Sequence, residues 1–100
     1  MDDFLQVVTT VGSEEEAERL AHGIAGARLA ACFQIAGPIR SLDWRQGVLK
    51  DAREWQLVIK DISSEEQLAE VAAYIKANLS YETPEIIVIP TLLYDEEYMR

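Results

Sequence analysis

The sequence predicts an α+β fold in which two helices cover one face of a four-stranded antiparallel sheet. Apolar segments with strand-like and helix-like periodicity alternate in the order β-α-β-β-α-β along the 100 residues. Each helical segment is also preceded by serine in a capping pattern. Two β-α-β units with right-handed crossovers place both helices on the same side of one sheet.

The first β-α-β unit begins with residues 4–11, which are rich in valine and threonine and predict a strand. Ser13 and Glu16 form a capping box that begins a helix, because the hydroxyl and the carboxylate satisfy exposed backbone donors. A second strand over about residues 31–35 should stop at Gly37–Pro38. The apolar face of the helix is expected to comprise Ala17, Leu20, Ala21, Ile24 and Ala25.

The middle of the chain predicts a bent, extended hairpin. Residues 39–45 and 48–60 would form its two strands, which turn at Gln46–Gly47. Residues 50–53 are too charged for a core and should lie at an edge, whereas residues 54–60 return to an apolar strand.

The second β-α-β unit repeats the first. Ser63 and Ser64 are competing caps for its helix, each with a partner side chain three residues later. Residues 86–92 begin with four consecutive apolar β-branched residues and predict a final strand that is buried on both faces. The apolar stripe of the second helix is expected to comprise Leu68, Val71, Ala72, Ile75 and Leu79. These elements complete a ferredoxin-like βαββαβ sandwich, a single domain over residues 1–100.

Composition limits the partners. Nine basic residues against eighteen acidic ones give a net charge of −9. A nucleic-acid partner needs clusters of Lys and Arg that this chain lacks, and an anionic membrane surface is an equally poor partner. The acidic N-terminus does not have the pattern of a signal peptide, and one cysteine excludes an internal disulfide, so we expect a cytoplasmic protein.

Three common functions of this fold are excluded because the chain lacks the residues that they require. An RNA-recognition domain needs exposed aromatic and basic residues on a central strand, whereas residues 54–60 hold one tryptophan in an acidic domain. A metallochaperone would carry two cysteines in the first loop, and an acylphosphatase an arginine there. Residues 10–13 of this chain are Thr-Val-Gly-Ser.

The polar connection before the final strand is the best candidate site. Pro84 fixes its own φ and keeps the preceding residue extended, so Tyr81, Glu82 and Glu85 lie on a stiff connection. Rigid polar loops on a small scaffold commonly carry function. The two glutamates could instead pair with basic groups of a neighbouring subunit in a structural role.

Five segments carry a resemblance that covers nearly the whole chain: Ser13–Ala17, Arg28–Cys32, Gly37–Ser41, Glu54–Lys60 and Tyr81–Ile86. In this order and spacing the chain resembles the CutA divalent-cation-tolerance family. The resemblance implies a ferredoxin-like subunit in a homotrimer assembled through its sheet edges. It also implies an architecture related to the PII signalling proteins without their long nucleotide-gripping loop. Members are linked to tolerance of copper and other divalent ions, with no established catalytic activity.

The chain departs from the copper-binding members of that family. Those members carry a cysteine in the first strand and histidines before the proline turn, where this chain has Thr9, Asn78 and Leu79. No tight copper site is therefore expected there. Trp44 is displaced by one position from the family's tryptophan, so its side chain can face the other way.

The resemblance implies a ligand site in a cleft between subunits. Tyr81 would form a wall, with Glu82 and Glu85 as acceptors, Lys60 as counter-charge and Cys32 at the floor. Glu82 and Glu85 are the metal candidates, and their oxygens favour harder divalent cations than copper. A small anionic or zwitterionic ligand is the alternative occupant. Cys32 could instead be a buried apolar residue and Lys60 a strand-end charge.

Two functions remain open. The first is a non-enzymatic trimer involved in divalent metal ion tolerance, which binds cations or a small ligand between subunits. The second is a PII-like signalling or scaffold trimer that binds a metabolite or a partner protein. A hydrolase is disfavoured because the sequence shows no recognisable pair of a nucleophile and a general base.

Overall fold

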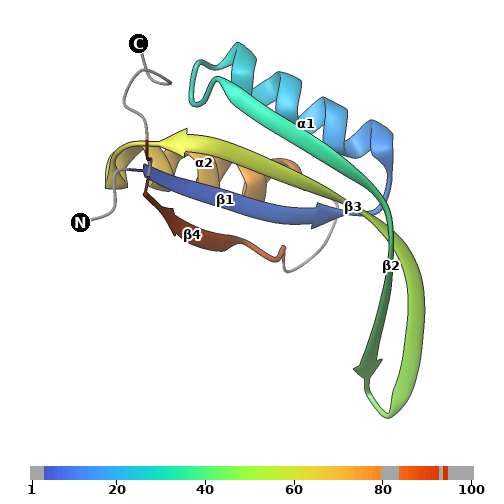
Figure 1. Ribbon diagram of the computed structural model, residues 1–100. Coiled ribbons are helices and arrows are strands. Elements are labelled where there is room, and N and C mark those ends of the chain that lie inside the picture. Colours follow the sequence, from blue (N-terminus) through green and yellow to red (C-terminus); the bar gives the residue numbers. More distant parts are fainter. Residues whose placement is uncertain (1–3, 80–83, 93, 95–100) are drawn as a thin grey trace.

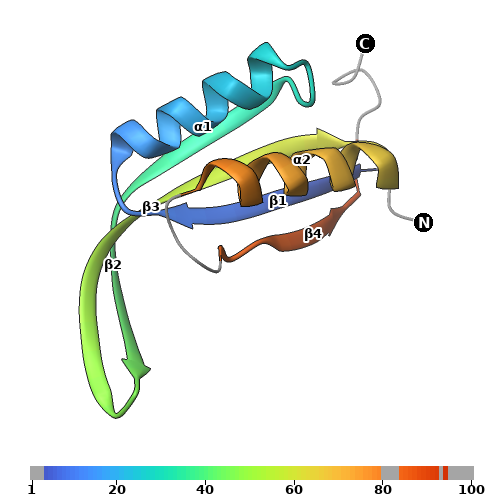
Figure 2. The ribbon, with the colours of Figure 1, turned by 180° about the vertical axis from the view of Figure 1, so that it is seen from behind.

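The computed structural model describes residues 4–79, 84–92 and 94. Its elements in chain order are β1 (Phe4–Val11), α1 (Glu14–Gly26), β2 (Cys32–Arg45), β3 (Val48–Ile62), α2 (Glu65–Asn78) and β4 (Ile87–Thr91). The four strands form one antiparallel sheet in the order β2-β3-β1-β4. Both helices lie on the same face of this sheet (Figures 1 and 2). The predicted βαββαβ sandwich is therefore confirmed.

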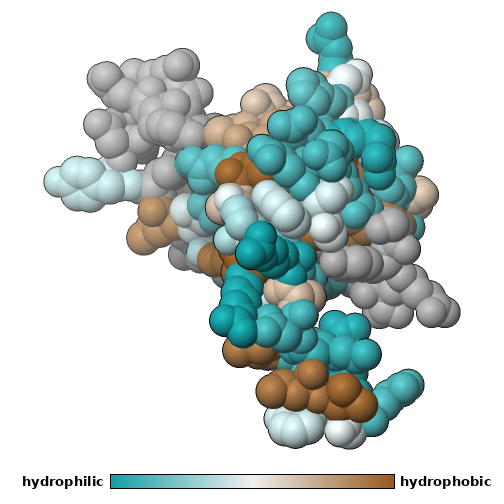
Figure 3. All heavy atoms as spheres, turned by 90° about the vertical axis from the view of Figure 1, so that its right-hand side faces the viewer, coloured by the Kyte–Doolittle hydropathy of each residue, from teal (hydrophilic) through white to brown (hydrophobic). Residues whose placement is uncertain are grey.

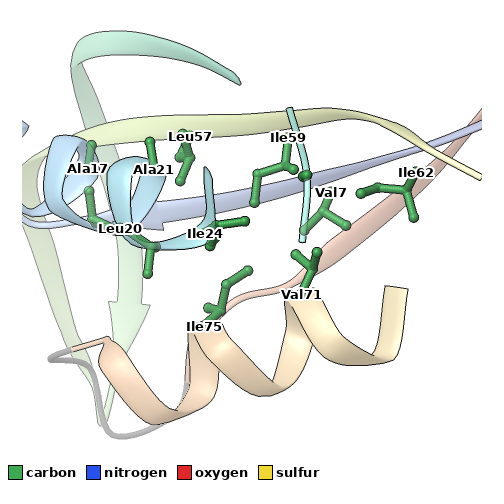
Figure 4. Packing of buried hydrophobic residues seen from close by; sticks show 12 residues of the cluster. Val7, Ala17, Leu20, Ala21, Ile24, Leu57, Ile59, Ile62, Val71 and Ile75 are labelled. Atoms are coloured by element: carbon green, nitrogen blue, oxygen red, sulfur yellow. The ribbon is translucent and has the colours of Figure 1, made fainter. Parts of the chain in front are cut away.

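The core fills the space between the helices and the sheet (Figure 4). Strand residues such as Val7 and Ile59 meet helix residues such as Ile24 and Ile75, and all four are fully buried. Each such side chain contributes about 1.5–3 kcal/mol by leaving water. Ala25, expected on the apolar face of α1, is exposed, because it lies at the edge of the arc that faces the sheet.

Serine caps begin both helices as predicted. The Ser13 hydroxyl accepts a hydrogen bond from the Glu16 backbone N–H at 3.1 Å. For α2 the competition is decided in favour of Ser64, whose hydroxyl accepts from the Gln67 N–H at 3.0 Å. Ser63 completes this capping box, because its N–H donates to the Gln67 side-chain oxygen at 2.9 Å. Neither helix, nor any other within the described residues, has the length and apolarity needed to cross a membrane.

The prediction that the second strand stops at Gly37–Pro38 is wrong. β2 continues through this dipeptide to Arg45. Gly37 and Pro38 together face the single residue Trp55, which is the geometry of a β-bulge. The paired residues on either side of the bulge are Ala36 with Gln56 and Ile39 with Glu54. Continued pairing with β3 overrides the local turn signal, because the bulge absorbs the extra residue.

Beyond the bulge, β2 and β3 form a hairpin arm, residues 39–54, that curves away from the helices and the rest of the sheet (Figure 1). Gln46 and Gly47 both have positive φ, 51° and 78°, as the predicted two-residue turn requires. The arm makes the molecule elongated, with principal extents of 47 × 27 × 21 Å.

The prediction that the last strand is buried on both faces is also wrong. β4 lies at the edge of the sheet, beside β1. Ile87, Val88 and Ile89 are 44%, 40% and 43% exposed. The apolar run predicts a strand correctly. Its burial depends on which elements pack against it, and this cannot be deduced from the run itself.

Candidate functional site

A groove of about 840 Å³ lies where the hairpin arm leaves the sheet. At the sheet it is lined by Thr10 of β1, Gln56 of β3 and Glu85, which precedes β4. Thr10 and Gln56 are cross-strand partners, so their side chains share one face. Of the residues predicted for the site, Glu85 is the one that the described residues place in this groove.

The arm supplies the rest of the lining from alternate positions. On β3, Lys50 and Glu54 lie an even number of residues before Gln56 and therefore point to the same face. On β2 the bulge shifts the alternation, so that Asp43 and Arg45 line the groove.

The charges of the groove are unevenly distributed. Its sheet end carries the carboxylates of Glu54 and Glu85, whereas its arm end carries the cations of Lys50 and Arg45. Asp43 accepts a charge-assisted hydrogen bond from Arg45 Nε at 3.1 Å, which neutralises the acid of the arm end. The groove is thus suited to a ligand of mixed charge.

The described residues do not form a metal centre. Within residues 4–79, 84–92 and 94, no three His, Cys, Asp or Glu side chains gather closely enough to hold an ion. Glu85 and Glu54 offer oxygen ligands, but a divalent cation of the hard class takes six or more. Glu82 and Tyr81, the other residues predicted at this end, lie outside the described residues.

Cys32 and Lys60 lie next to each other on the sheet, but outside the groove. They are directly opposite each other on β2 and β3, and both are half-buried. Lys60 is four residues from Gln56 along β3, roughly 13 Å at the strand rise, and neither residue lines the groove. One protomer therefore brings Cys32 to Lys60, but brings neither of them to Glu85.

The positions that the resemblance marks for copper ligands are Thr9, Asn78 and Leu79, and all three lie within the described residues. Thr9 is fully buried beneath the helices, and its hydroxyl has no hydrogen-bond partner within the described part of the chain. Asn78 donates a hydrogen bond to the Tyr74 carbonyl at 2.9 Å and is exposed, while Leu79 caps α2.

Trp44 lies on the outer face of the arm, away from the groove. It is opposite Leu49, and the two side chains are 74% and 52% exposed. Figure 3 shows the apolar side chains that gather near the end of the arm, where Leu42 and Val48 are also exposed. Trp44 is thus exposed on the face of the arm opposite the groove.

Sequence reasoning missed the arm residues of the groove, Asp43, Arg45, Lys50 and Glu54. Charged residues at alternate positions of residues 50–54 were the signal that could have indicated them. The signal on β2 was hidden, because the bulge changes which alternate residues share a face.

Similarity to known proteins supports the same fold over nearly the whole chain. A family model described as the CutA1 divalent ion tolerance protein matches residues 5–100. The chain belongs to this family. The divalent-cation tolerance protein CutA of Archaeoglobus fulgidus is 41% identical over 90 residues, which are 90% of this chain and 83% of that protein. The CutA protein of Pectobacterium atrosepticum is 32% identical over 97 residues, 97% of this chain and 86% of its own length.

Solved structures of CutA1 proteins agree with the fold of this family member. The crystal structure of CutA1 from Oryza sativa superposes with a TM-score of 0.86 at 34% identity, and the match covers 94% of this chain and 84% of that one. The structure described as the periplasmic divalent cation tolerance protein CutA from Archaeoglobus fulgidus gives 0.85 at 37% identity, covering 94% and 89%.

Proposed function

We propose that the protein is a non-enzymatic homotrimer of the CutA type that serves in divalent metal ion tolerance. The exposed strand β4 carries this proposal. Its residues Ile87 to Ile89 form an apolar sheet edge without a charged side chain, and such edges invite pairing with another chain. Relatives named as divalent-cation tolerance proteins support the physiological role.

The ligand would bind between subunits, at the end of β4 that holds Glu85. This carboxylate is exposed beside the strand edge on which a second copy would add. Tyr81 and Glu82 would belong to the same wall, with Lys60 and Cys32 brought from the adjoining subunit. Carboxylate oxygens suit harder divalent cations such as magnesium, whereas copper prefers thiolate and imidazole ligands.

Two measurements test the proposal. Light scattering should give a mass of about 34 kDa, three times the protomer's 11.3 kDa. Calorimetric titration of the trimer with magnesium, zinc and copper chlorides should then show binding that Glu85→Gln weakens. Glu18→Gln, which removes an exposed carboxylate from α1, is the matched control. A stable monomer, or ion binding that is equal in both variants, would contradict the proposal.

The alternative is a PII-like signalling or scaffold trimer that binds a metabolite or a partner protein. The groove favours this alternative, because its opposite charges at two ends suit an organic ligand better than a bare cation. A panel of zwitterionic and anionic metabolites, titrated into the same trimer, would separate the two functions. Cytoplasmic localisation and the absence of nucleic-acid and membrane partners stay predictions.

A further inference from the structure

We propose that Gly37 and Trp55 are the positioning residues of the groove. Their contact holds the bulge that turns the charged side of the hairpin arm toward Glu85. Neither residue lines the groove itself. The inference concerns the geometry of the site and rests on the proposed function only where it predicts a change in ligand binding.

The bulge decides which face of β2 lines the groove. Before it, Ala36 shares a face with Gln56, so the even-numbered residues of β2 face this side of the sheet. After it, Ile39 is opposite Glu54, and the odd-numbered residues take over. The residues of β2 that line the groove are Ile39, Ser41, Leu42, Asp43 and Arg45, and all of them except Leu42 are odd-numbered.

If β2 paired regularly through Gly37–Pro38, with both residues retained and no bulge, the pairing of the arm would shift by one residue. Arg40 would face Ala52 in place of Ser41, and Trp44 would face Val48 in place of Arg45. The groove would then lose the ion pair at its arm end and gain an indole. The mixed charge of the groove therefore depends on one bulge.

Trp55 holds this bulge from the side of the core. Its indole is half-buried and packs against the core cluster beneath the helices. A Cβ on Gly37 would lie 2.7 Å from Cγ and 2.9 Å from Nε1 of Trp55, closer than real Cβ atoms approach. Because Cγ is the first ring atom, the indole cannot make room by rotating its far end. A residue without a side chain is required at position 37.

The outer face of the arm is consistent with the bulged pairing. Arg40 donates from Nε and Nη2 to the carboxylate of Asp51, at 3.0 and 2.6 Å. This bidentate hydrogen bond links β2 to β3 on the face opposite the groove. Arg40 is directly opposite Arg53 on that face.

The test is Gly37→Ala, observed by NMR of the intact protein. The substitution should displace the Trp55 indole resonance and abolish the cross-strand proton contacts of Ser41 with Ala52, which are directly opposite in the native pairing. Gly26→Ala is the matched control, because a Cβ there meets nothing within 4 Å. Ile24→Val, at a fully buried helix position, controls for lost stability alone. Both controls should retain the contacts between Ser41 and Ala52.

Rescue separates positioning from general stability. In a Trp55→Ala background the clashing ring atoms are gone, so adding Gly37→Ala should change the arm resonances little further. If Gly37→Ala prevents folding, Trp55→Phe gives a milder loss of the contact and should still shift the Ser41 and Ala52 resonances. Native contacts in Gly37→Ala, or equal disturbance by Ile24→Val, would overturn the inference.

Ligand binding gives the second readout. Where zinc or magnesium binds in a Glu85-dependent manner, Gly37→Ala should weaken binding about tenfold while Gly26→Ala leaves it unchanged. If the native protein binds neither ion but Gly37→Ala still disturbs the arm, the proposed function fails and the role of the bulge stands. If ions bind and Gly37→Ala does not alter their affinity, the role in positioning the site fails instead.

Discussion

Thr9 is an anomaly at the scale of a single residue. Its hydroxyl is fully buried under the helices, yet it makes no hydrogen bond with any described residue. An unsatisfied buried polar group costs about 1–3 kcal/mol, because the group has lost its water without gaining a partner. The backbone of Thr9 pairs normally with Leu57, so the cost arises from the side chain alone.

Thr9→Val should therefore stabilise the protein by about 1 kcal/mol, since it replaces the hydroxyl by a methyl group of similar volume. Chemical denaturation at one fixed protein concentration would measure the change. Thr10→Val, on the groove face of the same strand, should give no such gain. A loss of stability in Thr9→Val would mean that the hydroxyl has a partner.

The Arg40–Asp51 pair makes a prediction about pH. The hydrogen bond from Arg40 lowers the pKa of Asp51 below its ordinary value of 3.8. A carboxyl whose pKa is lowered on folding adds stability at neutral pH, and this stability is lost as pH falls through the folded value. Asp51→Asn should thus destabilise the protein slightly at neutral pH, with a difference that declines as pH falls toward 3.8 and is lost as pH falls through the lowered pKa of Asp51.

Denaturation of the native protein and Asp51→Asn at several pH values would check this expectation. Because both side chains are exposed, the difference at neutral pH should also shrink in high salt. A difference that persisted in acid or in high salt would indicate that Asp51 acts through packing instead of charge.

At the scale of elements, α1 and α2 approach each other where Gly23 meets Tyr74. A Cβ at Gly23 would overlap the far end of the Tyr74 ring, with Cζ at 2.7 Å. The ring can move aside, but it would then lose its packing on α1. Alanine is itself better than glycine in a helix by about 1 kcal/mol. The two effects oppose each other.

Gly23→Ala should therefore change the free energy of unfolding little in the native protein. In a Tyr74→Leu background, where the ring is gone, the same substitution should stabilise by about 1 kcal/mol. A double-mutant cycle measured by chemical denaturation tests this coupling. Equal effects in both backgrounds would show that Tyr74 does not fill the space above Gly23.

The elements themselves were largely predictable, because their signals are local. Ser13 and Ser64 begin helices through bonds to residues three positions later, and Gln46–Gly47 has the chemistry of a two-residue turn. The path of β2 was not predictable in this way. Gly37–Pro38 reads locally as a break, and only pairing with Trp55 on another strand converts it into a bulge.

The candidate site residues also differ in whether local sequence or strand register determines their position. Glu85 was predicted because it precedes an apolar strand in a stiff polar connection, a pattern visible in the sequence, and it lines the groove. Lys60 was predicted with Cys32 in a cleft between subunits, and within one chain the two residues lie opposite each other, away from Glu85. Distances between strands follow from register, and register depends on bulges that local patterns do not encode.

At the scale of the whole molecule, the exposed edge of β4 is the feature most in need of a partner. The apolar run of residues 87–89 predicted a buried strand, but these residues are exposed within one chain, and the proposed trimer would cover them. Fold class could be predicted because it depends on the order of elements. The exposure of β4 could not, because it depends on the order of the strands in the sheet.

Ile89→Lys should lower the mass measured by light scattering toward the protomer's 11.3 kDa. A charge placed on the strand edge opposes pairing with another chain, while an already exposed position tolerates lysine within the protomer. Ala25→Lys, at an exposed position of α1, should leave the mass unchanged. An unaltered mass in Ile89→Lys would exclude this edge as the interface.

The bulge between Ala36 and Ile39 also constrains how the hairpin can change in length during evolution. Adding or removing a cross-strand pair at the Gln46–Gly47 turn would lengthen or shorten the arm without altering which side chains face the groove. Deleting one residue at Gly37–Pro38 would remove the bulge but leave Ile39 opposite Glu54, so the same side chains would still face the groove. Loss of the bulge with both residues retained would instead turn every side chain of β2 beyond it to the other face. Homologous hairpins should therefore vary in length at the turn, and those without the bulge should also lack one of its two residues.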